Sequence, residues 1–133
     1  MEIFYKHREL MEKLNKSTSN AIAVDFDGVI HKYSQGWKDG SIYDPPVEGA
    51  KECLSLLVKK GFTVVIFTTR LNPELNDDVN LEVNKVTRWL SSFGFRKGVH
   101  YHEITAIKPR AVVYIDDRAM RFINWQDAMK RLL

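Results

Sequence analysis

Residues 21–28 read AIAVDFDG, an apolar run that ends in two acids and a glycine. A run without polar interruption is typical of a strand buried on both faces, and in an open α/β sheet ligands bind beyond the carboxyl ends of such strands. Because side chains two apart share a face of a strand, Asp25 and Asp27 converge on one point if the strand continues past Phe26. Two carboxylates held that close resist joint ionisation unless a cation lies between them. The alternative is an acidic turn that ends the strand, with Gly28 supplying a positive φ.

The bulk composition indicates one globular domain. The 133 residues are 44% hydrophobic and 28% charged, and no apolar stretch approaches the roughly 20 residues of a membrane span. The net charge of +3 is compatible with an anionic substrate but too small to indicate a nucleic-acid-binding surface. Early charged residues argue against a signal peptide, so we expect a cytoplasmic protein without membrane contact. The single cysteine, Cys53, excludes an internal disulfide, and its place on an apolar helical pattern favours a packed thiol.

Hydrophobic periodicity predicts helices and strands in alternation. An amphipathic helix over about 2–15 precedes the first strand, and a broken pattern over about 29–46 indicates a flap that covers the acids. Gly61 and Gly94 are placed to end two helices. Right-handed crossovers make the sheet parallel, so residues 1–133 are predicted to form a single α/β domain with a Rossmann-like sheet and helices on both faces. The remaining expected elements are helices over 47–58, 79–93 and 122–132 and strands over 62–67, 101–106 and 111–115.

Chemically reactive side chains follow three of the expected strands. Because the carboxyl ends of parallel strands share one edge of the sheet, these side chains are expected to meet. Carboxylates with few histidines favour a hard cation such as Mg²⁺, while a hydroxyl, a lysine and an arginine suit the remaining oxygens of a phosphoryl group. The set comprises Asp25, Asp27, Thr68, Thr69, Arg70, Asp116 and Asp117, with Lys108 from the loop before the last strand.

These residues resemble, in order, the four motifs of the haloacid dehalogenase (HAD) superfamily of phosphohydrolases. The motif positions are Asp25-Phe26-Asp27-Gly28, Thr68, Lys108 and Asp116-Asp117, and the resemblance extends from Ala21 to about Trp125. The chain departs from the family pattern at Val29, where many members carry threonine, and at the doubled aspartate, where they carry glycine-aspartate. The second departure leaves open which aspartate binds metal directly, and matching the pair to glycine-aspartate favours Asp117.

The resemblance implies a Mg²⁺-dependent phosphomonoester hydrolase. Asp25 would attack phosphorus and form an aspartyl-phosphate, and Asp27 would protonate the leaving oxygen, then activate water, and bind the metal through its backbone carbonyl. It further implies that the metal site comprises Asp25, Asp27, Asp116 and Asp117, and that the phosphoryl group is bound by Thr68, Thr69, Arg70 and Lys108.

The spacing of the motifs leaves no room for a cap domain. About 40 residues separate Asp27 from Thr68, and about 40 more separate Thr68 from Lys108. Capless members of the superfamily tend to act on large substrates or to close their sites by oligomerising, so a homo-oligomer is one expectation. The triplets Thr68-Thr69-Arg70 and Asp116-Asp117-Arg118 also resemble the phosphatase half of polynucleotide kinase-phosphatases. The alternatives are therefore a polynucleotide 3′-phosphatase, a nucleotidase, or a catalytically silent module that binds a phosphorylated ligand, either a small molecule or a nucleic-acid end.

Several aromatic and histidine residues have two interpretations. Trp37 and Tyr43 in the flap either stack on a substrate or, as aromatics in loops more often do, anchor their own loop. His31 lies close behind the acids and is a candidate substrate contact. His100 and His102 alternate as on a strand edge and could form a metal-binding pair. Because no third metal ligand lies nearby in the sequence, they are instead expected to be exposed.

Overall fold

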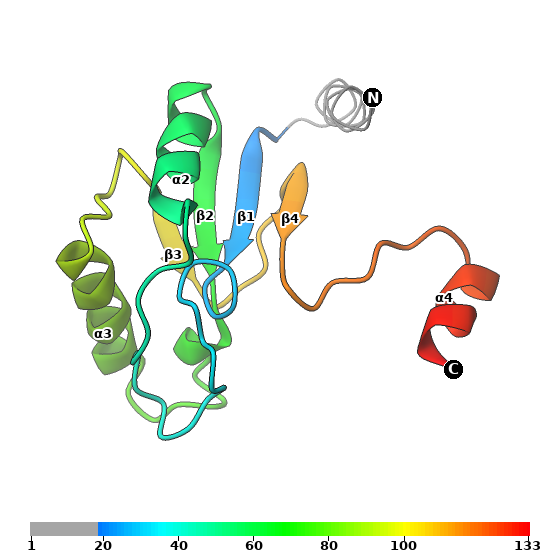
Figure 1. Ribbon diagram of the computed structural model, residues 1–133. Helices are drawn as coiled ribbons and strands as arrows, with labels where there is room; N and C mark the ends of the chain where they lie inside the picture. Colours follow the sequence, from blue (N-terminus) through cyan, green and yellow to red (C-terminus); the bar gives the residue numbers. More distant parts are fainter. Residues whose placement is uncertain (1–18) are drawn as a thin grey trace.

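The structure is a computed structural model that describes residues 19–133 (Figure 1). The helix predicted over about 2–15 lies outside the described residues. No helix among residues 19–133 is long and apolar enough to cross a bilayer. The elements are β1 (Ala21–Asp25), α2 (Ala50–Lys59), β2 (Thr63–Phe67), a 3₁₀ turn η1 (Thr69–Leu71), α3 (Val79–Ser92), β3 (Glu103–Thr105), β4 (Val113–Ile115) and α4 (Trp125–Leu132).

The strands form one parallel sheet, as the sequence predicted. Its order is β3-β2-β1-β4, and β1 therefore lies between β2 and β4. Asp25 is in register with Phe67 at the end of β2, and Val24 is in register with Ile115 at the end of β4. The residues that follow these three strands are consequently brought to the same edge of the sheet. β3 and β4 are shorter than predicted, with three residues each.

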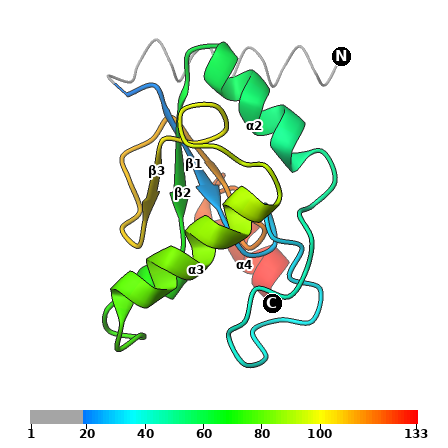
Figure 2. The same ribbon diagram turned by 90° about the vertical axis from the view of Figure 1, so that its left-hand side faces the viewer.

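The hydrophobic core lies on one face of the sheet. Ile22 and Val24 of β1 and Val64 and Ile66 of β2 point to this face and pack in one cluster with Leu54, Val86, Trp89 and Leu90 from α2 and α3. α2 lies in front of β2 in Figure 1, and α3 lies in front of the strands in Figure 2. Both helices connect neighbouring strands in the same direction across the sheet, so right-handed crossovers place them on the same face. We expected helices on both faces, but within residues 19–133 the two helices that pack on the sheet share one.

Glycine ends α2 where the sequence predicted. Gly61 has a φ of 95°, and its N–H donates to Val58 O while the next residue, Phe62, donates to Leu57 O. This pair of hydrogen bonds is a Schellman motif, which satisfies the last carbonyls of a helix and needs the left-handed conformation that glycine adopts without strain. Gly94 ends α3 with the same pair of hydrogen bonds. Its N–H donates to Ser91 O, and the N–H of Phe95 donates to Leu90 O.

The predictions for one cysteine and for two histidines were wrong. Cys53 is exposed rather than packed, because it lies on α2 outside the stripe that faces the sheet. His100 is buried, 8% exposed, and its Nδ1 accepts a hydrogen bond from the N–H of Arg96. His102 is half-buried and accepts from the N–H of Val64 through Nδ1. Both imidazoles therefore bind backbone amides of their own fold.

The C-terminal helix is present as predicted, but it is separate from the sheet. An extended segment carries α4 away from β4, as Figure 1 shows. Its apolar side chains are consequently exposed, including Trp125, Met129 and Leu132.

Candidate active site

A pocket opens at the carboxyl edge of the sheet. It receives side chains from the ends of β1, β2 and β4 and from the loop over residues 29–46. This loop is closed at its base by an isolated antiparallel bridge between His31 and Pro46. The structure thus brings together six of the predicted site residues. The lining residues are Asp25, Asp27, Tyr33, Trp37, Phe67, Thr68, Thr69, Asp116, Asp117 and Arg118.

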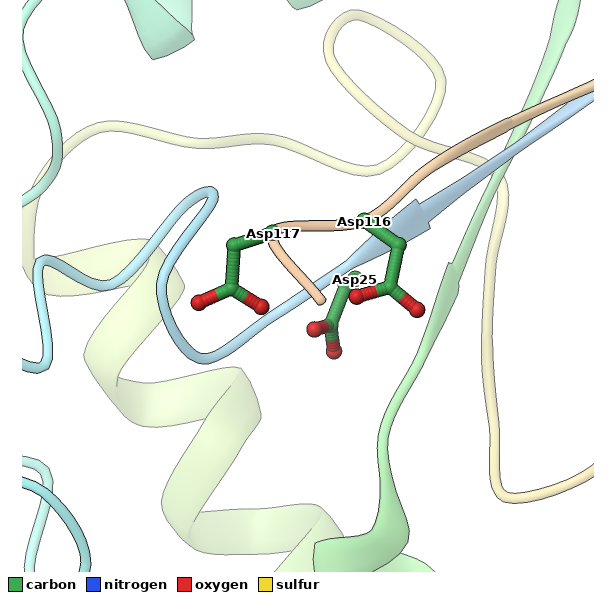
Figure 3. Close-up of side chains that lie close together, drawn as sticks. All are labelled: Asp25, Asp116 and Asp117. Atoms are coloured by element: carbon green, nitrogen blue, oxygen red, sulfur yellow. The ribbon is translucent and has the colours of Figure 1, made fainter. Parts of the chain in front are cut away.

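Three carboxylates converge in this pocket (Figure 3). Asp25, Asp116 and Asp117 each offer one oxygen, and these oxygens lie within 4.8 Å of one another. The register of β1 with β4 explains the convergence, because Asp25 ends one strand and the pair follows the other directly. Carboxylate oxygens from a small number of side chains, with room for water and a phosphate oxygen, are the donor set that suits Mg²⁺. The three residues could therefore hold a hard divalent cation.

The environment of Asp25 disfavours its charged form when no cation is bound. Burial and the neighbouring charges of Asp116 and Asp117 raise the pKa of its carboxyl from 3.8 to about 7, although a hydrogen bond from the Phe26 N–H opposes this rise. A divalent cation between the three carboxylates would remove the repulsion. The charge pattern of the site therefore favours cation binding.

This raised pKa predicts how the stability of metal-free protein depends on pH. Between pH 3.8 and about 7 the folded state keeps a proton on Asp25 that the unfolded state has released, so this contribution to stability decreases as the pH rises through that interval. In EDTA, we expect the Tm of the wild type to fall between pH 4 and 7 relative to that of Asp25→Asn, which has no such proton. Parallel Tm curves for the two proteins would contradict the prediction.

Asp27 does not join the three converging carboxylates, contrary to the expectation that Asp25 and Asp27 face one point. β1 ends at Asp25, so the alternation of a strand does not extend to Asp27. Its carboxylate instead accepts from Arg70 Nε at 2.8 Å, from Arg70 Nη2 at 3.0 Å and from His31 Nδ1 at 2.8 Å. Burial alone would raise the pKa of Asp27, but these hydrogen bonds outweigh burial and hold the pKa below its ordinary value. Asp27 is thus held as an anion.

Arg70 binds Asp27 and is not among the described residues that line the pocket. The residue is 1% exposed, its Nη1 donates to the carbonyl of Gly40 at 2.7 Å, and its guanidinium lies 4.7 Å from the centre of the Trp37 ring. We expected this arginine to bind a phosphoryl group. In the structure it links the end of β2 to Asp27 and to the 29–46 loop.

His31 completes the support of Asp27. It is fully buried, at 0% exposed, and its ring lies among Phe26, Tyr43 and Trp89. The N–H of Asp44 donates to His31 Nε2 at 3.1 Å, which assigns the ring proton to Nδ1, the atom that faces Asp27. His31 is therefore a buried link between the loop and Asp27, and not the substrate contact that the sequence suggested.

The threonines and the lysine of the predicted site differ in their placement. Thr68 is buried in the pocket wall, and its Oγ1 accepts from the N–H of Arg70, so the hydroxyl proton points elsewhere and is available to an acceptor in the pocket. Thr69 is exposed at the rim. Lys108 differs from the expectation, because its Nζ lies 4.4 Å from the centre of the Tyr114 ring and it is not among the described residues that line the pocket.

Three lining residues, Tyr33, Phe67 and Arg118, were missing from the predicted site. Arg118 brings a cation to the pocket directly after the aspartate pair, and its N–H donates to Asp116 Oδ1. Its position two residues beyond Asp116 was the available signal. Tyr33 lies in the loop with a φ of 57°, a left-handed conformation that is uncommon outside glycine and often marks functional sites. Nothing in the sequence around Tyr33 indicates that conformation.

Gly28 is required by the position of Asp117. It has a φ of 88°, and a Cβ at this residue would lie 2.1 Å from an Asp117 carboxylate oxygen. We expect Gly28→Ala to displace Asp117 and to weaken Mg²⁺ or Mn²⁺ binding by about 10- to 100-fold, the range seen when groups that orient metal ligands are lost. Isothermal titration calorimetry with Mn²⁺ measures this change. Gly36→Ala is the matched control, because Gly36 also has a positive φ but a Cβ there meets open space; equal Mn²⁺ affinities for the two variants would contradict the prediction.

Comparisons of the chain with protein-family models, with curated proteins and with solved structures found no match.

Proposed function

We propose that this protein is a Mg²⁺-dependent phosphomonoester hydrolase that acts through an aspartyl-phosphate on Asp25. The observation that carries the proposal is the convergence of Asp25 with Asp116 and Asp117 in a pocket that also holds Thr68 and Arg118. The order of the motifs supports a capless member of the HAD superfamily, and the parallel α/β sheet is consistent with that fold.

The proposed reaction has two displacement steps. A carboxylate oxygen of Asp25 forms a bond to phosphorus while the bond from phosphorus to the leaving oxygen breaks, and the leaving oxygen takes up a proton. Water then attacks the same phosphorus, the bond to Asp25 breaks, and inorganic phosphate leaves with the carboxylate restored. Asp25, Asp116 and Asp117 would hold Mg²⁺. The ion would supply positive charge that offsets the negative charge of the carboxylates and of the phosphoryl oxygens.

Other side chains of the pocket suit the phosphoryl group. Thr68 can donate its hydroxyl proton, and Arg118 offers a guanidinium at the pocket wall, so both can bind phosphoryl oxygens. Lys108 would contribute only after leaving the ring of Tyr114. Positioning and charge stabilisation of this kind supply most of the catalysis of phosphoryl transfer.

Asp27 is suited to the second step. As an ionised carboxylate beside Asp25 it can accept a proton from the attacking water. To protonate the leaving oxygen in the first step, Asp27 must first take up a proton from solvent, against the three hydrogen bonds that favour its anionic form. The pair of Arg70 and His31 thus acts on the reaction through Asp27, as positioning residues.

Phosphate release from p-nitrophenyl phosphate tests the proposal. We expect release in Mg²⁺ and none in EDTA, with activity restored when Mg²⁺ is added back. A folded protein that is inert in both conditions would contradict hydrolysis and favour the catalytically silent binding module. An oligonucleotide 3′-phosphate and a nucleoside monophosphate, assayed in parallel, separate the polynucleotide 3′-phosphatase and the nucleotidase from a phosphatase of other small molecules.

A further inference from the structure

A second hollow adjoins the acidic pocket. It is lined by Trp37, Thr69, Leu75 and Asn76, and it shares Trp37 and Thr69 with the acidic pocket. The two hollows therefore meet at Trp37 and Thr69, so a molecule that places a phosphoryl group among the carboxylates has the second hollow beside it. We refer to the hollow as the Trp37 subsite.

The Trp37 subsite differs in chemistry from the acidic pocket. Leu75 is 67% exposed and Trp37 is 46% exposed, so two large apolar side chains face solvent at one place beside a charged site. Ligand sites typically combine such apolar surface with a few polar groups. Asn76 supplies polar character, and its Nδ2 donates to the carbonyl of Arg70 at 2.6 Å, which holds the side chain against the end of β2.

The indole of Trp37 is fixed before any ligand arrives. Gly40 packs against it so closely that a Cβ on Gly40 would lie 2.9 Å from the ring. The Arg70 guanidinium lies 4.7 Å from the ring centre and is itself held by Asp27 and by the carbonyl of Gly40. An aromatic ring that is ordered in advance binds flat groups with little loss of side-chain entropy.

We propose that the Trp37 subsite binds the leaving group of the substrate, and that this leaving group carries a flat aromatic or heteroaromatic ring. The proposal rests on the proposed function, because it assigns the phosphoryl end of the same molecule to the acidic pocket. Leu75 and Trp37 provide the apolar contact for the ring, and Thr69 lies at the boundary between the two parts of the substrate.

A pair of substrates that differ only in the ring tests the proposal. 2-Phenylethyl phosphate and 2-cyclohexylethyl phosphate release similar alcohols, so a difference in kcat/KM reports recognition of the flat ring rather than leaving-group reactivity. We expect the wild type to prefer the phenyl substrate by about 10-fold, a preference that corresponds to the lower end of the stacking free energies of single rings. Adenosine 5′-monophosphate in a third arm distinguishes a nucleobase from a simple aryl group as the natural ring.

Variants connect this preference to the Trp37 subsite. In Trp37→Ala and in Leu75→Ala we expect the ratio of kcat/KM between the phenyl and the cyclohexyl substrate to fall toward 1, and Trp37→Phe to keep part of it. Leu75→Ala is included because Trp37 also contacts Arg70, whereas Leu75 is largely exposed. Leu81→Ala, an exposed leucine on α3, is the control and should leave the ratio unchanged.

The outcomes separate this proposal from the proposed function. Phosphate release with no preference between the two rings, or a preference that survives both alanine variants, would overturn the Trp37 subsite while the hydrolase stands. Absence of release from every substrate would overturn the hydrolase; binding of 2-phenylethylphosphonate and 2-cyclohexylethylphosphonate, followed by calorimetry, then tests the subsite alone. Tighter binding of the phenyl compound that is lost in Leu75→Ala would support the subsite, and equal binding would overturn it.

Discussion

Asp25→Asn is expected to reduce phosphate release from p-nitrophenyl phosphate by at least about 10³-fold in kcat, as replacement of a catalytic nucleophile does. An amide of the same shape has no negative charge to bring to phosphorus, and its oxygen is a poor nucleophile. The substitution also removes one of the three carboxylates that converge in the pocket, so Mg²⁺ binding should weaken as well. Steady-state phosphate release at saturating Mg²⁺ measures the first effect, and Mn²⁺ calorimetry measures the second.

A loss of folding can be separated from this loss of chemistry. Because burial and the neighbouring aspartates disfavour a charged Asp25, the asparagine variant should have a Tm in EDTA at pH 8 that equals or exceeds that of the wild type. Asp77→Asn makes the same change at an exposed position outside the acidic pocket and should retain activity. Activity of Asp25→Asn within tenfold of the wild type would exclude Asp25 as the nucleophile.

The fold was predictable from the sequence because its signals are local. The apolar runs at β1 and β2 mark the two central strands, and glycines such as Gly61 mark the helix ends. Parallel pairing then follows from alternation and crossover handedness. The positions of Asp25 and of Asp116 at strand ends follow from the same rule, and this is why their convergence could be expected from the sequence.

The contacts of Asp27 could not be predicted in the same way. Arg70 lies 43 residues from Asp27 in the sequence. The direction in which each of the two side chains points depends on where the preceding strand ends. The sequence indicated that both residues would reach the same edge of the sheet, but not that the guanidinium would be buried against the carboxylate. His31 was placed behind the acids correctly, but its role depends on the Asp44 N–H, which only the closed loop brings to the ring.

The placement of side chains outside the strands was also not predictable from the sequence. Lys108 was expected in the pocket because its place in the motif order suggested it, whereas the structure places its Nζ over Tyr114. Cys53 lies at helical spacing from apolar neighbours, yet the stripe of α2 that faces the sheet passes to one side of it. A helical pattern gives the centre of a buried face more reliably than its margins.

Arg70→Met is expected to lower the free energy of unfolding by about 3 kcal/mol at pH 7, because it leaves the Asp27 carboxylate as an incompletely paired charge in a largely buried position. Methionine keeps much of the aliphatic length of arginine, so the effect reports the lost ion pair and the lost hydrogen bond to Gly40 O rather than a large cavity. Urea denaturation measures the change. Lys85→Met removes a cation that pairs with Glu82 at the surface of α3, and it should cost less than about 1 kcal/mol.

The pH dependence of the destabilisation tests whether the charge of Asp27 causes it. In the wild type the pKa of Asp27 is lowered on folding, so its contribution to stability is complete above the pKa of the unfolded state and is lost as the pH falls through the folded pKa. The destabilisation by Arg70→Met should therefore be largest at neutral pH and decrease in acid, where Asp27 is protonated and needs no cation. The double variant Asp27→Asn with Arg70→Met should be more stable at pH 7 than Arg70→Met alone, since it removes the carboxylate that the single variant leaves unpaired. A destabilisation that does not change with pH, and that the second substitution does not relieve, would show that Arg70 stabilises the fold through packing on Trp37 and Gly40 and not through the charge of Asp27.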